Sequence, residues 1–505
     1  MCADLGREGV RLTTTGVSTS TDRRRWLVLG VICIAQLMVV LDLTVMNIAL
    51  PSAQRALHFS TADRQWVVTA YSLAAGSLLL AGGRVGDLIG RKTTFLVGLI
   101  GFAGVSAVGG AATNFATLVA ARALQGVFSA VLVPTSLALL ITTFTSAKDR
   151  AKALGVFGAI AAGGGAIGLL LGGALTDYLS WRWTLYINLV FAGFALVGGI
   201  MLLDGKESRT KFELDVPGVL LASAGLFCIV FGFSNAATHS WQSPGTWGTL
   251  IAGVILLALF ATWIGRTPNP LLPPRILLDR TRSGGYISVF VAALCLFATF
   301  FFLTYYLQRT LGYSPIKTGV AFLPTSASLA IAANIATIAI LPRVGPRWVV
   351  SGGLLIGSGA MAWLAQLGAH TAYASGVLGP IILAGIGFGL VFAGAITAGT
   401  YNVEPRDAGE ASAMVSVGQQ LGASVGTALL NTLFASAVTS YLATHSPATG
   451  TQALAQAHGY DTAFWWTAGI AIAGAVVVGT LLRSGPLLDP SRLTVVPSKP
   501  VPDQA

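Results

Sequence analysis

Fourteen stretches of apolar residues recur along the chain, and they constrain its fold more than any other feature. They cover residues 26–50, 65–83, 93–111, 115–138, 152–175, 183–203, 217–234, 247–265, 284–307, 317–341, 348–367, 374–400, 411–437 and 462–482. About 20 apolar residues cross ~30 Å of hydrocarbon, and only helices satisfy their own amides there. Charged residues make up 10% of the chain, against about 25% in soluble domains. The sequence therefore predicts an all-α polytopic membrane protein with 14 transmembrane helices.

The positions of the basic residues predict how the helices are oriented. If the N-terminus is cytosolic, 24 of the 30 Lys and Arg residues fall in cytosolic segments and five in outer ones. Such an excess follows the positive-inside rule and indicates an even number of spans with both termini in the cytosol. We expect a bacterial plasma membrane protein. The net charge of +11 then reflects topology rather than contact with nucleic acid.

Side chains that could catalyse a reaction or bind a metal are sparse. The four cysteines have no metal-ligand spacing. All five histidines fall in predicted outer loops, where an ordinary loop role is favoured over pH sensing. No Ser/His/Asp set, metal cluster or phosphate-binding loop is present in the sequence. We therefore expect no enzyme activity, no metal and no cofactor.

The first apolar stretch contains one charged residue, Asp42. A carboxylate within a membrane costs at least ~2.5 kcal/mol on insertion scales, so it should face a polar cavity or carry a proton. Acids in such positions are functional sites by default. Asp42 is therefore the predicted proton-binding group of a membrane transporter. The alternative is an acid that only pairs structurally with a cation on another helix.

Arg122 is the charge predicted to lie nearest Asp42. It is eight residues into the fourth span, which enters from outside near Asn114, and this corresponds to a depth of ~12 Å. Asp42 is eight residues short of the outer end of the first span, near Leu50. The two charges should therefore lie at similar depth, in contact directly or through water. Arg122 would favour the charged carboxylate, whereas removal from water would favour the neutral acid. Alternatively, Arg122 pairs only with helix carbonyls or Gln125.

Five motifs together resemble the major facilitator superfamily, in particular its fourteen-span drug:proton antiporter branch. They are LDLTVMNIALP (41–51), GRVGDLIGRK (83–92), LVAARALQG (118–126), WRWTLYIN (181–188) and LQRTLGYSPIKTGVAFLP (307–324). The resemblance implies two six-helix bundles, at 26–203 and 284–483, joined by a linker at 204–283 that contains two extra transmembrane helices. Residues 1–25 and 484–505 would be cytosolic tails, the first of them disordered. A binding cavity between the bundles would open alternately to each side.

The loop GRVGDLIGRK also has a physical interpretation of its own. Gly83 and Gly90 would permit close helix approach and a tight turn. Asp87 can accept hydrogen bonds from a helix N-terminus or an arginine across the bundle interface. Arg91 and Lys92 would hold the loop at the anionic inner leaflet. We expect a cytosolic gate that latches the outward-facing state, with a simple topogenic turn as the alternative.

The fifth span contains a glycine face. Gly164, Gly168 and Gly172 recur every fourth residue, with Gly173 beside them, so a neighbouring helix can approach closely. The stretch resembles the antiporter motif of the family. Leu169 stands where that motif usually has Pro, which removes a kink and restores a helix hydrogen bond.

Neutral polar residues within the spans are the candidates for lining the substrate cavity. They are Asn47, Gln125, Asn188, Asn334, Gln419, Gln420 and Asn431. Polar residues between helices also serve simply to hold them together, at ~0.6 kcal/mol each. Their scarcity favours a hydrophobic ligand over a sugar.

The family resemblance implies proton-driven export of hydrophobic, often cationic, drugs or antibiotics. The partners would be the small substrate, protons and the lipid bilayer, and the protein would act as a monomer without nucleic acid. The proton gradient would drive export without a cofactor. Two other functions stay open: proton-coupled uptake of a nutrient or metabolite, and a membrane sensor or scaffold. The absence of a sizeable soluble region in the sequence disfavours the last of these.

Overall fold

The computed structural model describes residues 18–61, 63–144, 146–203, 215–239, 241–268, 270, 272, 274–368, 371–403, 408–445 and 450–485. The helices of the first part are α1 (Ser18–Leu57), α2 (Trp66–Ile89), α3 (Arg91–Gly110), α4 (Phe115–Thr143), α5 (Ala147–Tyr178) and α6 (Trp183–Leu202). They are followed by α7 (Val216–His239), α8 (Pro244–Ile264) and the short α9 (Pro274–Leu278). The remainder comprises α10 (Arg280–Tyr305), α11 (Pro315–Ala321), α12 (Leu323–Ile335), α13 (Leu341–Val344), α14 (Pro346–Leu364), α15 (Leu378–Gly399), α16 (Ala408–Thr444) and α17 (Thr451–Leu481).

Each of the fourteen predicted stretches contains helix. In the part that the structure describes, twelve helical segments are long and apolar enough to cross a membrane. The other two predicted stretches form α2 and α14, of 24 and 19 residues, which are not among those twelve. The multi-pass helical architecture is thus confirmed, and the count of 14 crossings stays a prediction.

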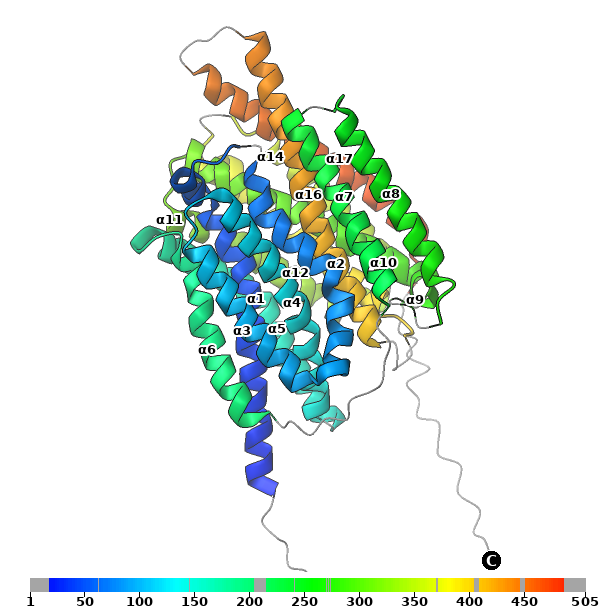
Figure 1. Cartoon of the computed structure of the whole chain (residues 1–505). Helices are drawn as coiled ribbons and strands as arrows, with labels where there is room; N and C mark the ends of the chain where they lie inside the picture. Colours follow the sequence, from blue (N-terminus) through cyan, green and yellow to red (C-terminus); the bar gives the residue numbers. More distant parts are fainter. Residues whose placement is uncertain are drawn as a thin grey trace, which may run out of the picture.

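Helix ends differ from the predicted spans where polar residues continue a helix. α1 begins at Ser18, within the predicted tail, whose first 17 residues lie outside the described part. α17 begins at Thr451, because the Ala- and Gln-rich segment before the apolar stretch favours helix without being apolar. The end of α16 and the beginning of α17 project beyond the other helices at the top of Figure 1 (orange).

Hydrogen-bonding side chains and prolines fix several helix starts. The Asn114 side chain accepts the Thr117 amide at the start of α4 (2.8 Å). Asp279 accepts two backbone amides at the start of α10, which places the predicted boundary at 284 inside that helix. The predicted span 317–341 is divided into α11, α12, the π-helical segment η3 (Ala336–Ile340) and α13. Pro324 lies in the first turn of α12, where the missing amide costs nothing.

The helices pack as two groups, with α7 and α8 on the outside of the bundle (Figure 1). In the first group α1 packs against α5 and α6, α2 against α4, and α3 against α4 and α6. In the second group α10 packs against α15, α16 and α17, while α14 packs against α15 and α17. α7 packs against α8 and contacts both α2 and α16. The extra pair therefore lies along the seam where α2 and α16 meet.

A glycine with positive φ makes the same tight connection in each group. Gly90 has φ +98° between α2 and α3, and Gly345 has φ +82° between α13 and α14. Residues other than glycine rarely adopt this conformation. Gly90 therefore makes the tight turn that the sequence predicted. The close helix approach that was predicted at Gly83 occurs instead at the preceding residue, Gly82. A Cβ at Gly82 would lie 2.1 Å from the Ala130 carbonyl oxygen, whereas at Gly83 it would make ordinary contact with Pro134.

The glycine face of α5 is closely approached by a neighbouring helix, as predicted, and that helix is α1. A Cβ at Gly164 would lie 3.1 Å from Val40, and one at Gly172 would lie 2.8 Å from the Cα of Val45. Gly168 faces Thr44, with only 1.9 Å between such a Cβ and the hydroxyl oxygen. The side chains absent from this face allow α1, with Asp42, to lie against the α5 backbone.

Adding one methyl group to this face is expected to destabilise the protein. Gly172→Ala would force α1 and α5 apart, because the nearest atoms belong to the Val45 backbone. Overpacking of this kind typically costs about 1–3 kcal/mol. Gly163→Ala is the matched control on the same helix, since its Cβ would have no atom within 4 Å. Thermal unfolding of the purified variants should show a lower Tm for Gly172→Ala alone. Equal Tm values would contradict the packing account.

The two groups are joined by backbone contacts and hydrogen bonds at one end, here called the Arg64 end. There the Gln308 side chain donates to the Ile48 carbonyl (2.9 Å), and the Ile316 amide donates to Asp177 (3.3 Å). Gly173 of α5 lies against the backbone of Ile316, and Gly319 of α11 lies against the Leu169 carbonyl. Backbone therefore meets backbone between the groups, and this end of the seam is closed.

Candidate functional site

A buried ion pair occupies the interior of the first helix group. The Arg122 Nη1 donates to Asp42 Oδ2 at 2.5 Å, and each residue is 1% exposed. Asp42 lies on α1 and Arg122 on α4. Counting residues along these two helices predicted that the two charges lie at similar depth, and in the structure they are in direct contact. The ion pair that the sequence predicted is present.

Neutral groups complete the hydrogen bonding of the carboxylate. The Gln125 and Asn188 side chains donate to Asp42 Oδ1, at 3.0 and 2.7 Å. Both amides also donate to the Ser106 hydroxyl, at 2.7 and 3.3 Å, and that hydroxyl donates to the Phe102 carbonyl. The carboxylate thus accepts three hydrogen bonds, so that both of its oxygen atoms have partners in this buried place.

Arg122 makes each of the contacts that the sequence left as alternatives. Besides Asp42, it donates to the Val67 carbonyl (3.0 Å) and to the Gln125 amide oxygen (2.9 Å). Its guanidinium also lies over the ring of Tyr71, 4.5 Å from the ring centre. Five helices, α1, α2, α3, α4 and α6, supply this network. Protonation of Asp42 would weaken the ion pair and leave Arg122 supported by neutral groups alone.

The predicted cavity residues are distributed over several places. Gln125 and Asn188 are fully buried in the Asp42 network, and Asn431 is fully buried near the Arg64 end. Asn47 is buried one turn beyond Asp42, with no hydrogen-bond partner for its carbonyl oxygen. Asn334 and Gln419 are exposed, and Asn334 donates to its own helix at the Ala330 carbonyl. Gln420 lies against Gly76 on the seam between α2 and α16. Their roles in binding substrate stay predictions.

The predicted gate loop is described in part. The Lys92 ammonium donates to the carbonyls of Leu203 and Ile200 at the end of α6, so it caps a helix of its own group. The side chain of Asp87 lies outside the described residues. Arg84 of the same motif lies in the last turns of α2, which continues to Ile89, and forms an ion pair with Glu410 of α16 at 3.6 Å. This pair links the two helix groups at the end opposite Arg64, and the sequence motifs did not single out Glu410.

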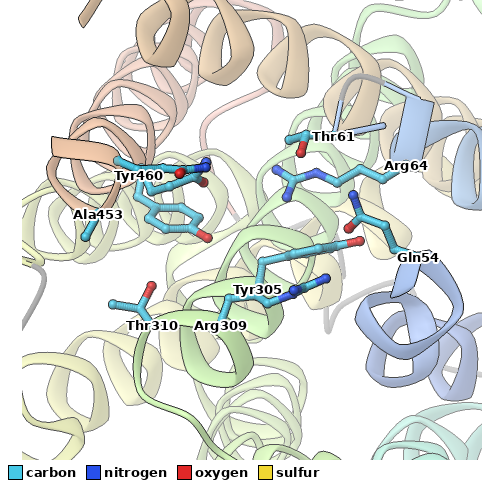
Figure 2. Close-up of a pocket in the computed structure, with 10 residues that line it drawn as sticks. Gln54, Thr61, Arg64, Tyr305, Arg309, Thr310, Ala453 and Tyr460 are labelled. Atoms are coloured by element: carbon cyan, nitrogen blue, oxygen red, sulfur yellow. The ribbon is translucent and has the colours of Figure 1, made fainter. Parts of the chain in front are cut away.

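Sequence reasoning also missed a buried cation at the seam. Arg64 lies in the short helical turn η1 (Asp63–Gln65) before α2 and is only 2% exposed. Its Nε donates to the Asn431 side chain of α16 at 3.0 Å. The rings of Phe301, Phe302, Tyr305 and Phe434 lie 4.1–5.9 Å from its guanidinium carbon. Figure 2 shows Arg64 and Tyr305 reaching from the two groups toward a common space. The sequence signal was only an arginine at a span edge.

The chain is similar to a known protein family and to named bacterial proteins. A family model described as Major Facilitator Superfamily matches residues 32–427. The chain is 45% identical to the puromycin resistance protein pur8 of Streptomyces alboniger, over 92% of each chain. It is 36% identical to the cephamycin export protein CmcT of Amycolatopsis lactamdurans, over 90% of this chain and 92% of that protein.

Solved structures show the same fold at low sequence identity. A bacterial homolog of the human lysosomal transporter Spinster, in an inward-facing and occupied conformation, matches with a TM-score of 0.63 and 15% identity. The match covers 90% of this chain and 96% of that one. This likeness, with the family match, confirms the transporter fold that the sequence motifs predicted.

Proposed function

Because this chain belongs to the major facilitator superfamily, a family of membrane transporters, we propose that it exports a hydrophobic antibiotic or drug-like compound in exchange for protons. The export role is supported by relatives that are named for antibiotic resistance or export and match over about nine-tenths of the chain. The coupling to protons is supported by one observation above all: Asp42, a carboxylate buried in the membrane-spanning interior and bonded to Arg122. An intramembrane acid of this kind is a functional site by default.

The arrangement supports a simple cycle. With Asp42 ionised, Arg122, Gln125 and Asn188 compensate its charge. A proton arriving from outside neutralises the acid and weakens its bond to Arg122. Release of that proton to the cytosol restores the pair. Each proton that moves inward releases ~2.3 kcal/mol of free energy per 100 mV of membrane potential. A pH difference across the membrane adds to this driving force.

The orientation follows from the basic residues. The excess of Lys and Arg assigns the end with Gly90 and Gly345 to the cytosol, together with both termini. The Arg64 end is then extracellular. In this orientation, the closed seam at the Arg64 end separates the buried Asp42 from the outer water.

Efflux from cells tests the proposal directly. Cells that express the chain are loaded with a fluorescent hydrophobic dye or with puromycin, and its loss is followed with and without a proton uncoupler. We expect faster loss than from control cells, and the uncoupler should abolish the difference. Export that persists after the proton gradient collapses would exclude proton coupling. Equal retention by both cell types would exclude the tested compounds as substrates.

A further inference from the structure

A cavity of about 520 Å³ lies at the Arg64 end, between the two helix groups. Arg64 and Gln54 line it from the first group, while Tyr305, Arg309 and Tyr460 line it from the second. Figure 2 shows that these side chains, carried by separate elements, surround one space. The cavity is therefore assembled only while the seam is closed.

The charged side chains that line this cavity are both arginines. No Asp or Glu is among the lining residues. Within the part of the chain that the structure describes, neither guanidinium forms an ion pair with a carboxylate. Arg309 also lines a second cavity of about 270 Å³, together with Asp177, whose carboxylate accepts the Ile316 amide. The main cavity is therefore electrostatically positive.

Arg64 is incompletely compensated for so buried a cation. Its Nε is bonded to Asn431, and aromatic rings cover its guanidinium, but its Nη2 has no hydrogen-bond partner. The hydroxyl of Tyr305 also lacks one. A buried charge is normally paired as well as hydrogen-bonded, and an unsatisfied donor near a charge costs more than a neutral one. The missing partner must be an acceptor, and a negative one fits best.

We propose that this cavity is a binding site for an anionic group, such as a carboxylate or phosphate, held between Arg64 and Arg309. Guanidinium groups bind such planar or tetrahedral oxyanions through paired N–H donors. Because the two arginines belong to different helix groups, the bound anion would bridge the seam and favour its closed state. The anion is either a free ion from the outer water or the acidic group of a larger compound. The site does not depend on the exported compound or on proton coupling.

Thermal unfolding of the purified full chain in lipid nanodiscs tests this site. Sodium chloride, sodium phosphate and sodium benzoate are titrated separately, so that free inorganic ions are compared with a carboxylate on an apolar ring. Each titration is repeated with Arg64→Gln, Arg309→Gln and Arg182→Gln. Arg182 is the matched control, because it lies at the same end but, among the described residues, donates hydrogen bonds only to carbonyls of its own helix group.

A saturable rise in Tm is expected for the natural protein with at least one probe. Its midpoint should move about tenfold or more to higher concentration in Arg309→Gln and in Arg64→Gln, since each loses a charged hydrogen-bond donor. Arg182→Gln should respond like the natural protein. A lower midpoint with benzoate than with phosphate or chloride would identify the acidic group of a larger compound, and the reverse would identify a free ion.

Two results would overturn the proposal. One is the absence of a saturable response to any of the three salts. The other is the same response in all four proteins, which would mean that the salts act through general exclusion from the protein surface. Arg64→Gln could fail to fold because Arg64 is buried among aromatic rings. In that case the response of Arg309→Gln tests the proposal by itself, since Arg309 is an exposed residue.

Discussion

Asp42→Asn is expected to abolish proton-dependent export while the protein still reaches the membrane. Asparagine cannot release a proton near neutral pH, but its amide oxygen can still accept the bonds from Gln125 and Asn188. The substitution leaves Arg122 buried without its partner, which in soluble proteins costs about 3–5 kcal/mol. Uncoupler-sensitive dye efflux and the amount of protein in the membrane are measured together.

A second variant separates lost coupling from lost stability. In Asp42→Asn combined with Arg122→Gln, no charge is stranded, so the Tm should recover relative to Asp42→Asn alone while export stays absent. Asp63→Asn serves as the matched control, because among the described residues that carboxylate accepts a hydrogen bond only from Ser60. Efflux at the natural rate by Asp42→Asn, still sensitive to the uncoupler, would eliminate Asp42 as the proton carrier.

Arg64→Gln is expected to open the seam at the Arg64 end. The variant loses a charged hydrogen bond to Asn431 and the stacking of a cation on Tyr305 and its neighbours. Together these contacts are worth about 3 kcal/mol, or roughly a hundredfold in the ratio of closed to open protein. The closed state should therefore be populated much less.

Disulfide formation across the seam measures this shift. Asp177→Cys and Ile316→Cys, introduced in a background without the native cysteines, place two thiols where the carboxylate now meets the Ile316 amide. Cross-linking should slow when Arg64→Gln is added and stay unchanged when Arg182→Gln is added. Arg182 also stacks on an aromatic ring, Trp181, but within its own helix group. Equal cross-linking with all three backgrounds would contradict a locking role for Arg64.

The sequence predicted what depends on hydropathy and chain length. The positions of the helices follow from apolar stretches, and the contact between Asp42 and Arg122 follows from counting residues along two antiparallel spans. The glycine face on α5 was predictable because glycines every fourth residue share one side of a helix. The polar start of α17 was missed, since hydropathy does not detect a helix rich in Ala and Gln.

The rotation of each helix about its axis could not be predicted from one sequence. Gln125 and Asn188 were assigned to a substrate cavity as polar residues in spans, yet they bond to Asp42 inside one helix group. Arg64 looked like an ordinary outer arginine, because its aromatic partners come from residues more than 230 positions away. Such partners emerge only when the two helix groups are placed side by side.

Within the described part of the chain, every residue that is hydrogen-bonded to Asp42 or Arg122 belongs to the first helix group. A rigid-body swing of one group against the other therefore stretches none of these bonds, and mechanical force alone cannot separate acid from base. In the proposed exporter, the exchange of a proton must then be timed by hydration. Water admitted along α1 would compete for the carboxylate and lower the barrier to its protonation. Entry of water, rather than the pull of one helix group on the other, would then couple proton uptake to substrate export.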